Sequence, residues 1–289
     1  MIKHLSVIIF ALTIGTSYSQ LDSLKYYGDV EFSKGNYVRA IENYSKSNRG
    51  NLSTKQLGRL LYSEYECNRF DEVDSSFTKW IEYGYMPNYI VSVLKYKYKK
   101  LIPFIEDTLF TPKKAYEWNQ LYGTIIAQSP TEFFKSNKFM LNDQHLRFVE
   151  INTSKRVDQE TFLRSDSLNM IDIIDYLSNN TPKFKKTTSD ILFGVIHHYC
   201  AENFFSVQQY NFFESKMTEL VNAGVLDIFD YCYYVDKYRV FHGEIQKYGT
   251  YSEMDGLTGI STNNYNKINS ERRKIGFHLK IEDQIKYRI

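Results

Sequence analysis

Apolar residues recur every three or four positions along most of the chain, which is the spacing of one face of an α-helix. The first clear segment of this kind follows Leu21 and is interrupted by Gly35 and Asn36, a pair typical of turns. The spacing resumes directly after this pair, so the segment predicts two short helices joined by a tight turn. The sequence therefore predicts a mostly α-helical protein that contains helical hairpins.

Small and aromatic residues stand at regular positions in this hairpin. These positions are Gly28, Phe32, Tyr37, Ala40 and Tyr44. Their spacing resembles a tetratricopeptide repeat, a helical hairpin with a period of about 34 residues. A weaker second repeat follows, with Val73 placed 33 residues after Ala40. Its matching positions are Phe70, Val73 and Phe77, and Leu61 stands in place of the glycine.

A third, degenerate pair of helices is predicted over residues 89–109 and 116–126, interrupted by Pro103 and Pro112. Hairpins of this kind cannot bury their apolar faces alone. We therefore expect the tetratricopeptide-like repeats of residues 20–130 to stack on one another and on the rest of the chain.

The repeat resemblance also implies a binding surface. In the family's mode of binding, a concave face with Tyr27, Glu31 and Tyr62 would hold a peptide or another envelope protein. Two clear repeats are fewer than usually stand alone. The alternative is therefore that the repeats serve only as a docking platform for the second half of the chain.

Longer amphipathic helices follow Pro130 and indicate a helical domain over residues 131–289. Helices are expected over residues 133–152, 159–179, 204–222 and 227–241, with a further one around Ile191. The expected buried stripe of the second of these is Phe162, Leu168, Ile171, Ile174 and Leu177. The stripe around Ile191 is Ile191, Leu192, Val195 and Tyr199. His198 is expected on or beside that stripe.

The helical pattern is lost after Gly243. The segment YGTYSEMDGLTGISTNN places Gly249, Gly256 and Gly259 among small polar residues, which predicts a long irregular loop, ordered or mobile. The tail then returns Ile275, Phe277, Leu279 and Ile281 to the core. The predicted fold class is thus mostly α, with short tetratricopeptide-like hairpins followed by a helical domain with an irregular, glycine-containing C-terminal loop.

Residues 1–19 have the pattern of a secretory signal peptide. A basic start precedes the apolar run Leu5–Ile14, and small residues at Ser17 and Ser19 precede Gln20. No later run reaches the ~18 to 20 apolar residues of a membrane helix. We expect an exported protein, periplasmic or secreted, without stable membrane insertion after cleavage near Ser19. An uncleaved anchor is the alternative.

Composition and charge narrow the function classes. With 289 residues, 43% hydrophobic and 24% charged, the chain is expected to be folded rather than disordered. A net charge of +2 provides no field that would attract nucleic acid. The basic segment LKYKYKKL is interpreted as a solvated helix face, so no nucleic-acid partner is expected. Aromatic residues make up 16% of the chain and suit core and seam packing, or protein and glycan contacts.

The cysteines and neighbouring histidines do not form a recognisable metal or disulfide pattern. Cys67, Cys200 and Cys232 are too few for a disulfide framework. Cys200 and Cys232 pair if their helices are neighbours, and otherwise they are buried free thiols. His197 and His198 are adjacent, but adjacent side chains on a helix point about 100° apart, which suits tetrahedral metal binding poorly. No metal and no cofactor is expected.

Several polar positions of the second half follow a common order and spacing. They are Asp143 and Gln144 with Arg147, Asp166 with Asn169, the helix of His198, Asp236, QKYGT at residues 246–250 and ERRKIGF at residues 271–277. This pattern is similar to that of the bacterial domain of unknown function family 6624, over about Lys138 to Ile285. The chain departs from the family at Lys237, where the family has arginine. Because the family has no known activity, the resemblance implies a fold and a set of site residues but no reaction.

The same side chains supply what general acid/base catalysis on an anionic or carbonyl substrate needs. In that hypothesis His198 is the acid/base, Asp236 fixes its tautomer, and Gln246 with Arg273 holds the substrate. The candidate ligand-binding residues are Asp143, Gln144, Arg147, Gln246, Tyr248, Arg272 and Arg273. No known nucleophile, phosphate-loop, metalloprotease or glycosidase motif accompanies them. Under the acid/base hypothesis, the protein would be an enzyme of hydrolase or transferase type.

The competing hypothesis is structural. His198, Asp236, Gln246 and Arg273 would form a buried hydrogen-bonded network that ties the irregular loop to the helices, since buried polar groups need partners. The sequence favours an exported, non-catalytic protein-interaction or ligand-binding module. An enzyme that uses this polar cluster is the alternative.

Overall fold

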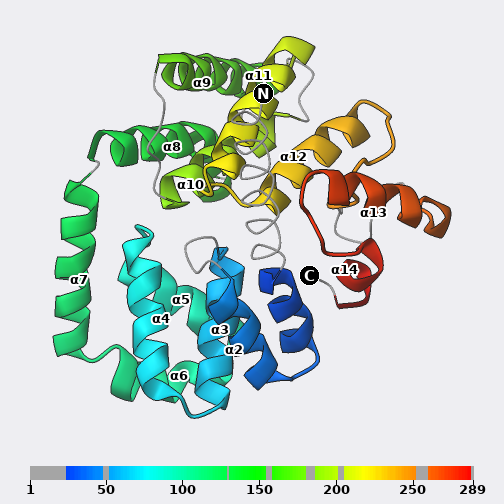
Figure 1. The fold of residues 1–289 in the computed structure, drawn as a ribbon. Coiled ribbons are helices and arrows are strands. Elements are labelled where there is room, and N and C mark those ends of the chain that lie inside the picture. Colours follow the sequence, from blue (N-terminus) through cyan, green and yellow to red (C-terminus); the bar gives the residue numbers. More distant parts are fainter. Residues whose placement is uncertain are drawn as a thin grey trace, which may run out of the picture.

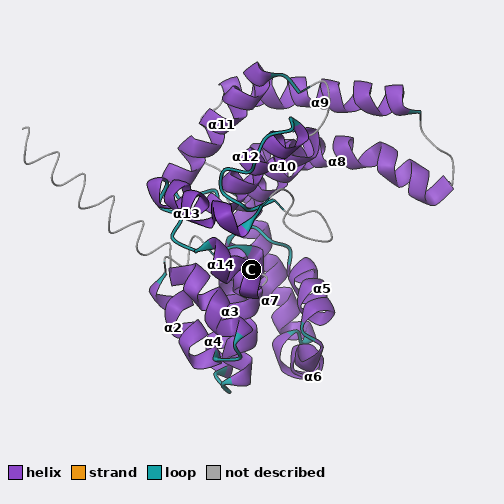
Figure 2. Cartoon of the chain, turned by 90° about the vertical axis from the view of Figure 1, so that its right-hand side faces the viewer, coloured by secondary structure: helices purple, strands orange, loops and turns teal. Residues whose placement is uncertain are grey.

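The computed structural model describes residues 24–47, 52–128, 130–153, 158–179, 186–200, 205–251 and 260–287. Over these residues the chain is built from helices joined by turns and loops, without a β-strand (Figure 2). The predicted mostly α-helical fold class is therefore confirmed. The predicted signal peptide lies outside the described residues.

Short helices form the lower part of the molecule in Figure 1. They are a first helix over residues 24–33, α2 (Tyr37–Lys46), α3 (Thr54–Glu66), α4 (Phe70–Glu82) and α5 (Pro87–Lys97). The turn before α2 places Gly35 at a φ of 75°, which glycine adopts without a clash of a Cβ atom. Ser53 and Gln56 form a capping box that begins α3.

The first helix and α2 approach closely at a glycine. A Cβ atom added to Gly28 would lie 2.6 Å from ring carbons of Tyr44. Tyr44 is fully buried, so its ring has no room to move aside. The spacing of a small residue and an aromatic residue that predicts the hairpin thus corresponds to a direct packing contact.

Beyond α5 the chain forms three short helical turns, Lys99–Leu101, α6 (Ile102–Phe104) and Ile105–Leu109. Pro103 lies in the first turn of α6, and Pro112 begins α7 (Pro112–Ala127). Pro112 stands where its missing N–H removes no helical hydrogen bond, whereas Pro103 follows two residues, Leu101 and Ile102, whose N–H groups donate to Tyr98 and Lys99. The ring of Trp118 on α7 packs 4.1 Å from that of Phe77 on α4, and α7 then leads into the second half of the chain (Figure 1).

The second half lies above and to the right of the short helices in Figure 1 and contains the longest helices, α8 (Pro130–Thr153) and α9 (Gln159–Asn179), together with shorter ones. The others are α10 (Lys186–Tyr199), α11 (Val207–Asn222), α12 (Ile228–Phe241), α13 (Tyr265–Lys274) and α14 (Ile281–Tyr287). The helices predicted over residues 159–179 and 227–241 agree with α9 and α12. Asp227 caps α12 by accepting the N–H of Phe229, as its position in the sequence suggests.

One predicted buried stripe is wrong at two of its five positions, whereas Leu177 of the same stripe is buried. Leu168 and Ile171 were expected inside, but they are 57% and 55% exposed. The inward face of α9 carries Asp166 and Asn169 together with apolar residues such as Ile173. These polar groups are accommodated because they find partners on α8 and α10, which the apolar spacing of a single helix does not reveal.

Two hydrophobic cores fill the molecule. One lies among the short helices and α7, and the other lies among α8 to α12 and the C-terminal tail. The first helix belongs to both regions, because its Tyr26 and Val30 lie in the second core. Lys25 forms an ion pair of 3.1 Å with Asp227, with both side chains buried, and the Tyr26 hydroxyl donates to the same carboxylate at 2.6 Å.

An adjoining face of the first helix contacts the short helices. Asp29 accepts hydrogen bonds there from the Tyr44 hydroxyl at 2.7 Å and from the Arg59 guanidinium at 2.6 Å. The residue before it, Gly28, packs on Tyr44. This helix is therefore the element through which the two halves of the chain are joined.

Two further expectations concern the membrane and the cysteines. Across the described ranges, no helix has the length and apolar character needed to cross a lipid bilayer. Cys200 and Cys232 are both buried and remain free thiols. Of the two outcomes left open by the sequence, the structure has the buried thiols.

Candidate functional site

The polar residues singled out in the second half fall into two separate clusters. Asp143, Gln144, Asp166, Asn169 and His198 gather where α8, α9 and α10 meet, and we call them the histidine cluster. Asp236, Gln246, Tyr248 and Arg272 surround the chain between α12 and α13, and we call them the loop network. The residues of the proposed catalytic group are thus divided between two places.

Asp236 is the centre of the loop network. Its buried carboxylate accepts the backbone N–H groups of Lys247 at 2.7 Å, Tyr248 at 2.9 Å and Thr250 at 2.7 Å. It also accepts the Thr250 hydroxyl at 2.8 Å. Burial raises the pKa of Asp236, and these hydrogen bonds oppose the rise. The Asp236 carboxylate therefore fixes the path of the backbone at residues 247–250, in the loop that follows α12.

Arg272 closes the same loop from α13. Its buried guanidinium donates to the carbonyl oxygens of Tyr248 and Leu279 at 2.6 Å each, to that of Gly249 at 3.2 Å and to Gln284 Oε1 at 2.5 Å. It also lies 4.6 Å from the centre of the Phe277 ring. Burial lowers the pKa of Arg272 to about 10. Because each of these contacts lies inside the protein, the Arg272 side chain has a structural role.

Gln246 completes the network by pairing with one backbone position. Its amide donates to the carbonyl oxygen of Tyr251 at 2.8 Å and accepts the Tyr251 N–H at 3.0 Å. Tyr248 is buried beside Tyr231, with their ring centres 6.1 Å apart. The residues of the QKYGT segment therefore shape and fix a loop.

Two expected roles are corrected by this geometry. Asp236 does not orient His198, because its carboxylate is occupied by the loop and His198 pairs with Asp143. Arg273 does not belong to the network, because its side chain is exposed and the neighbouring Arg272 makes the contacts. Adjacent residues on a helix face different directions, so only one of the two arginines points inward.

The histidine cluster contains an acid–imidazole pair. His198 Nδ1 lies 2.9 Å from Asp143 Oδ2, and the Gln144 amide also donates to this carboxylate. The Asp143 side chain is fully buried, whereas that of His198 is 48% exposed. A buried carboxylate on one ring nitrogen fixes the tautomer of a histidine and leaves the other nitrogen for a ligand.

Asn169 and Tyr199 form the inner side of the cluster. Asn169 Nδ2 donates to the carbonyl oxygen of Phe139 at 2.9 Å and to the Tyr199 hydroxyl at 2.8 Å. Burial raises the pKa of Tyr199, and the nearby carboxylates of Asp143 and Asp166 add to the effect. The phenol is therefore a neutral hydrogen-bonding group at physiological pH.

His197 does not share the surroundings of His198. Its ring packs 5.2 Å from Tyr233, and its Nε2 lies 3.2 Å from the carbonyl oxygen of Asp230. Burial, with a contribution from Lys237, lowers the pKa of His197 to about 3, so this ring stays neutral. Within the described part of the chain, histidines, cysteines and carboxylates do not gather in threes around a point where a metal ion would sit.

The two clusters can do different things. The loop network has its polar groups engaged in internal hydrogen bonds, so it supports structure. The histidine cluster has one solvent-accessible imidazole backed by a buried carboxylate, so it offers proton transfer or a hydrogen bond to a ligand. The side chain of Arg147, another predicted ligand-binding residue, lies outside the described side chains.

The contribution of Asp143 was predicted only as ligand binding, and that of Tyr199 only as core packing. A signal for the inward position of Asp143 exists, since it follows the buried Phe139 by four residues.

Compared with known protein families, with characterised proteins and with solved structures, the chain shows no match.

Proposed function

We propose that the protein is an exported, non-catalytic interaction protein that holds a peptide or another envelope protein on its short helices. The proposal keeps the resemblance of this region to tetratricopeptide repeats. The supporting observation is a row of aromatic side chains along the turns of the successive hairpins. We call it the aromatic ladder, and its members are Phe32, Tyr37, Tyr62, Tyr65, Phe70, Tyr98 and Phe104.

The ladder is continuous and reaches the surface. Ring centres lie 6.0 Å apart between Phe32 and Tyr62, 4.9 Å between Tyr62 and Tyr98, and 5.1 Å between Phe70 and Phe104. None of its members is fully buried, and Phe70 is 43% exposed. Partly exposed aromatic rings can bind proline, arginine and aromatic side chains of extended peptides with a small loss of side-chain entropy.

The three residues expected on the concave face have different surroundings. Tyr62 lies within the ladder, and Tyr27 is 47% exposed. Glu31 is held by the Lys34 ammonium at 2.7 Å and by the Asn36 amide at 2.9 Å. Part of the first helix is meanwhile covered by the second half of the chain through Lys25. The surface that suits a partner is therefore the partly exposed ladder, with Phe70 as its most exposed member.

The test is selection of a random peptide library displayed on phage against the whole chain after signal cleavage. We expect enrichment of peptides with proline, arginine or aromatic residues on the wild type, and loss of that enrichment on the double variant Tyr65→Ser, Phe70→Ser. Tyr96→Ser is the control, because Tyr96 is 83% exposed and lies outside the ladder. Equal enrichment on the ladder variant and the wild type would contradict the proposal, as would no enrichment at all.

A second candidate function rests on the pair of His198 and Asp143. We infer that, if the protein is an enzyme of hydrolase or transferase type, His198 is its acid/base and Asp143 takes the orienting role first given to Asp236. Hydrolysis of p-nitrophenyl esters and phosphates tests this idea. His198→Asn should lower kcat/KM about 100-fold. A wild-type rate no higher than that of the variant removes the catalytic alternative.

A further inference from the structure

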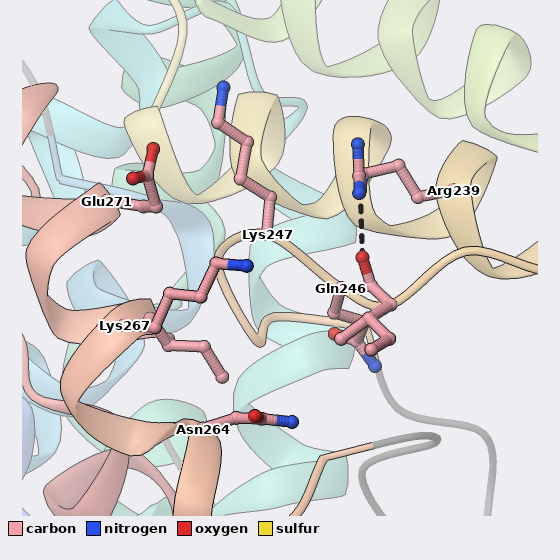
Figure 3. A pocket seen from close by; sticks show the side chains of 8 residues that line it. Arg239, Gln246, Lys247, Asn264, Lys267 and Glu271 are labelled. Carbon is pink, nitrogen blue, oxygen red and sulfur yellow. Dashed lines mark hydrogen bonds between the residues drawn. The ribbon is translucent and has the colours of Figure 1, made fainter.

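A recess lies between the C-terminal end of α12, the chain that follows it and one face of α13 (Figure 3). Its volume is about 270 Å³, near the lower limit of pockets that hold small ligands. Arg239, Lys247 and Lys267 line it with positive charge, and Glu271 is the acidic residue among its lining. The site is separate from both the aromatic ladder and the histidine cluster.

The acidic residues at this recess neutralise its basic residues only in part. Glu271 forms its ion pair with Lys274, and Glu244 pairs with Arg239 at 2.8 Å. Among the described residues, Lys247 and Lys267 form no ion pair with a carboxylate. Lys247 on the loop and Lys267 on α13 therefore contribute two ammonium groups that form no ion pair among the described residues, and their positive charge attracts an anion.

The positions of these groups are set by different elements. Figure 3 shows the Lys267 side chain reaching from α13 towards the loop, with its ammonium near the backbone of Lys247. The Arg239 guanidinium is fixed by a hydrogen bond of 2.8 Å from its Nε to the carbonyl oxygen of Ile245. Asn264 precedes α13, and its side chain does not cap that helix. Its amide lies on the same side of the recess as Lys267 and remains available as a donor (Figure 3).

The wall that carries Lys247 is rigid. Asp236 accepts the Lys247 N–H at 2.7 Å, and Gln246 is paired with Tyr251 through both ends of its amide. The loop network therefore holds the backbone of the recess in place through the Lys247 N–H and the Gln246 amide, while the Lys247 ammonium lies 5.1 Å from the centre of the Tyr248 ring. Such support lowers the cost of ordering a binding site when a ligand arrives.

Apolar surface accompanies the charges. Ile268 is buried beneath the recess, and Ile245 at its edge is 60% exposed. We propose that this recess binds a small organic anion, with its carboxylate or phosphate group between Lys247, Lys267 and Arg239 and a short apolar stem against Ile245. The ammonium groups sit on flexible stems and turn towards the anion as it enters.

Isothermal titration of the whole chain after signal cleavage tests the proposal. The probes are inorganic phosphate, butyl phosphate and butanoate, each at constant ionic strength set with sodium chloride. We expect saturable binding of butyl phosphate or butanoate. The first result assigns the site to phosphate esters and the second to carboxylates, and inorganic phosphate alone should bind more weakly because it lacks the stem.

Three variants then separate the site from general charge effects. Lys267→Gln should weaken binding about tenfold, since it removes one charged hydrogen bond. Lys113→Gln removes the same charge from an exposed position on α7 and should leave binding unchanged. Glu271→Gln should tighten binding, because it removes the competing carboxylate. Absence of saturable binding by any probe would overturn the proposal, as would equal weakening by the two lysine variants.

Discussion

Replacement of Arg272 by methionine is expected to lower the free energy of unfolding by about 4 kcal/mol, whereas Arg273→Met should change it by less than about 0.5 kcal/mol. The difference arises because the Arg272 guanidinium donates to Tyr248, Gly249, Leu279 and Gln284 inside the protein. Methionine fills a similar volume but leaves these buried acceptors without donors. Urea unfolding followed by circular dichroism measures both values.

The two arginines make a matched pair, since they are adjacent on α13 and only Arg272 is buried. Arg272→Lys should recover little of the loss, because an ammonium cannot reach acceptors spread across the plane of a guanidinium. Similar losses for Arg272→Met and Arg273→Met would show that the network does not hold the loop as described. A loss confined to Arg273→Met would restore that residue to the site.

Removal of the Asp236 carboxylate should have the second large effect. Asp236→Ala is expected to cost about 3 kcal/mol, because three backbone N–H groups and one hydroxyl lose a buried acceptor. Asp236→Asn should also destabilise the protein, since its amide turns a donor towards donors. Chemical unfolding measures the total loss of unfolding free energy, and hydrogen exchange shows which backbone amides lose protection.

Hydrogen exchange distinguishes a local loss of hydrogen bonds from a general loss of stability. The amides of Lys247, Tyr248 and Thr250 should exchange much faster in Asp236→Ala than in the wild type under native conditions. Asp107→Ala serves as the control, because Asp107 is exposed in the turns after α5. If these amides kept their protection, another group would have to be the acceptor that fixes the loop.

The course of the helices could be predicted from the sequence because their ends carry local signals. The boundaries of α9 agree with the prediction, and Asp227 and Gly224 mark the junction of α11 and α12. Caps and turns act over a few residues, so a single chain shows them. The tertiary partners of polar side chains depend on how helices meet, which local spacing does not contain.

The errors at the site have this origin. His198 pairs with Asp143 because α10 packs against α8. The residues near His198 and near Asp143 in the sequence do not predict this contact. The sequence does indicate which of the adjacent arginines points inward, because Arg272 follows the buried Ile268 by four residues and so lies on the same helix face. On α9, Asn169 lies four residues before the buried Ile173. A polar residue that continues an apolar face is therefore the signal for a buried network.

The first helix also constrains the order in which the chain can fold. The bond from Tyr26 to Asp227 spans 201 residues, and that from Ser33 to Tyr287 spans 254. Contacts between such distant segments require closure of a large loop, which slows folding. The helix that is synthesised early must therefore wait for the last part of the chain before it reaches its final surroundings. A nascent chain stopped before Asp227 would lack the carboxylate that pairs with Lys25 and accepts the Tyr26 hydroxyl, so the first helix could not yet make these contacts with the second half.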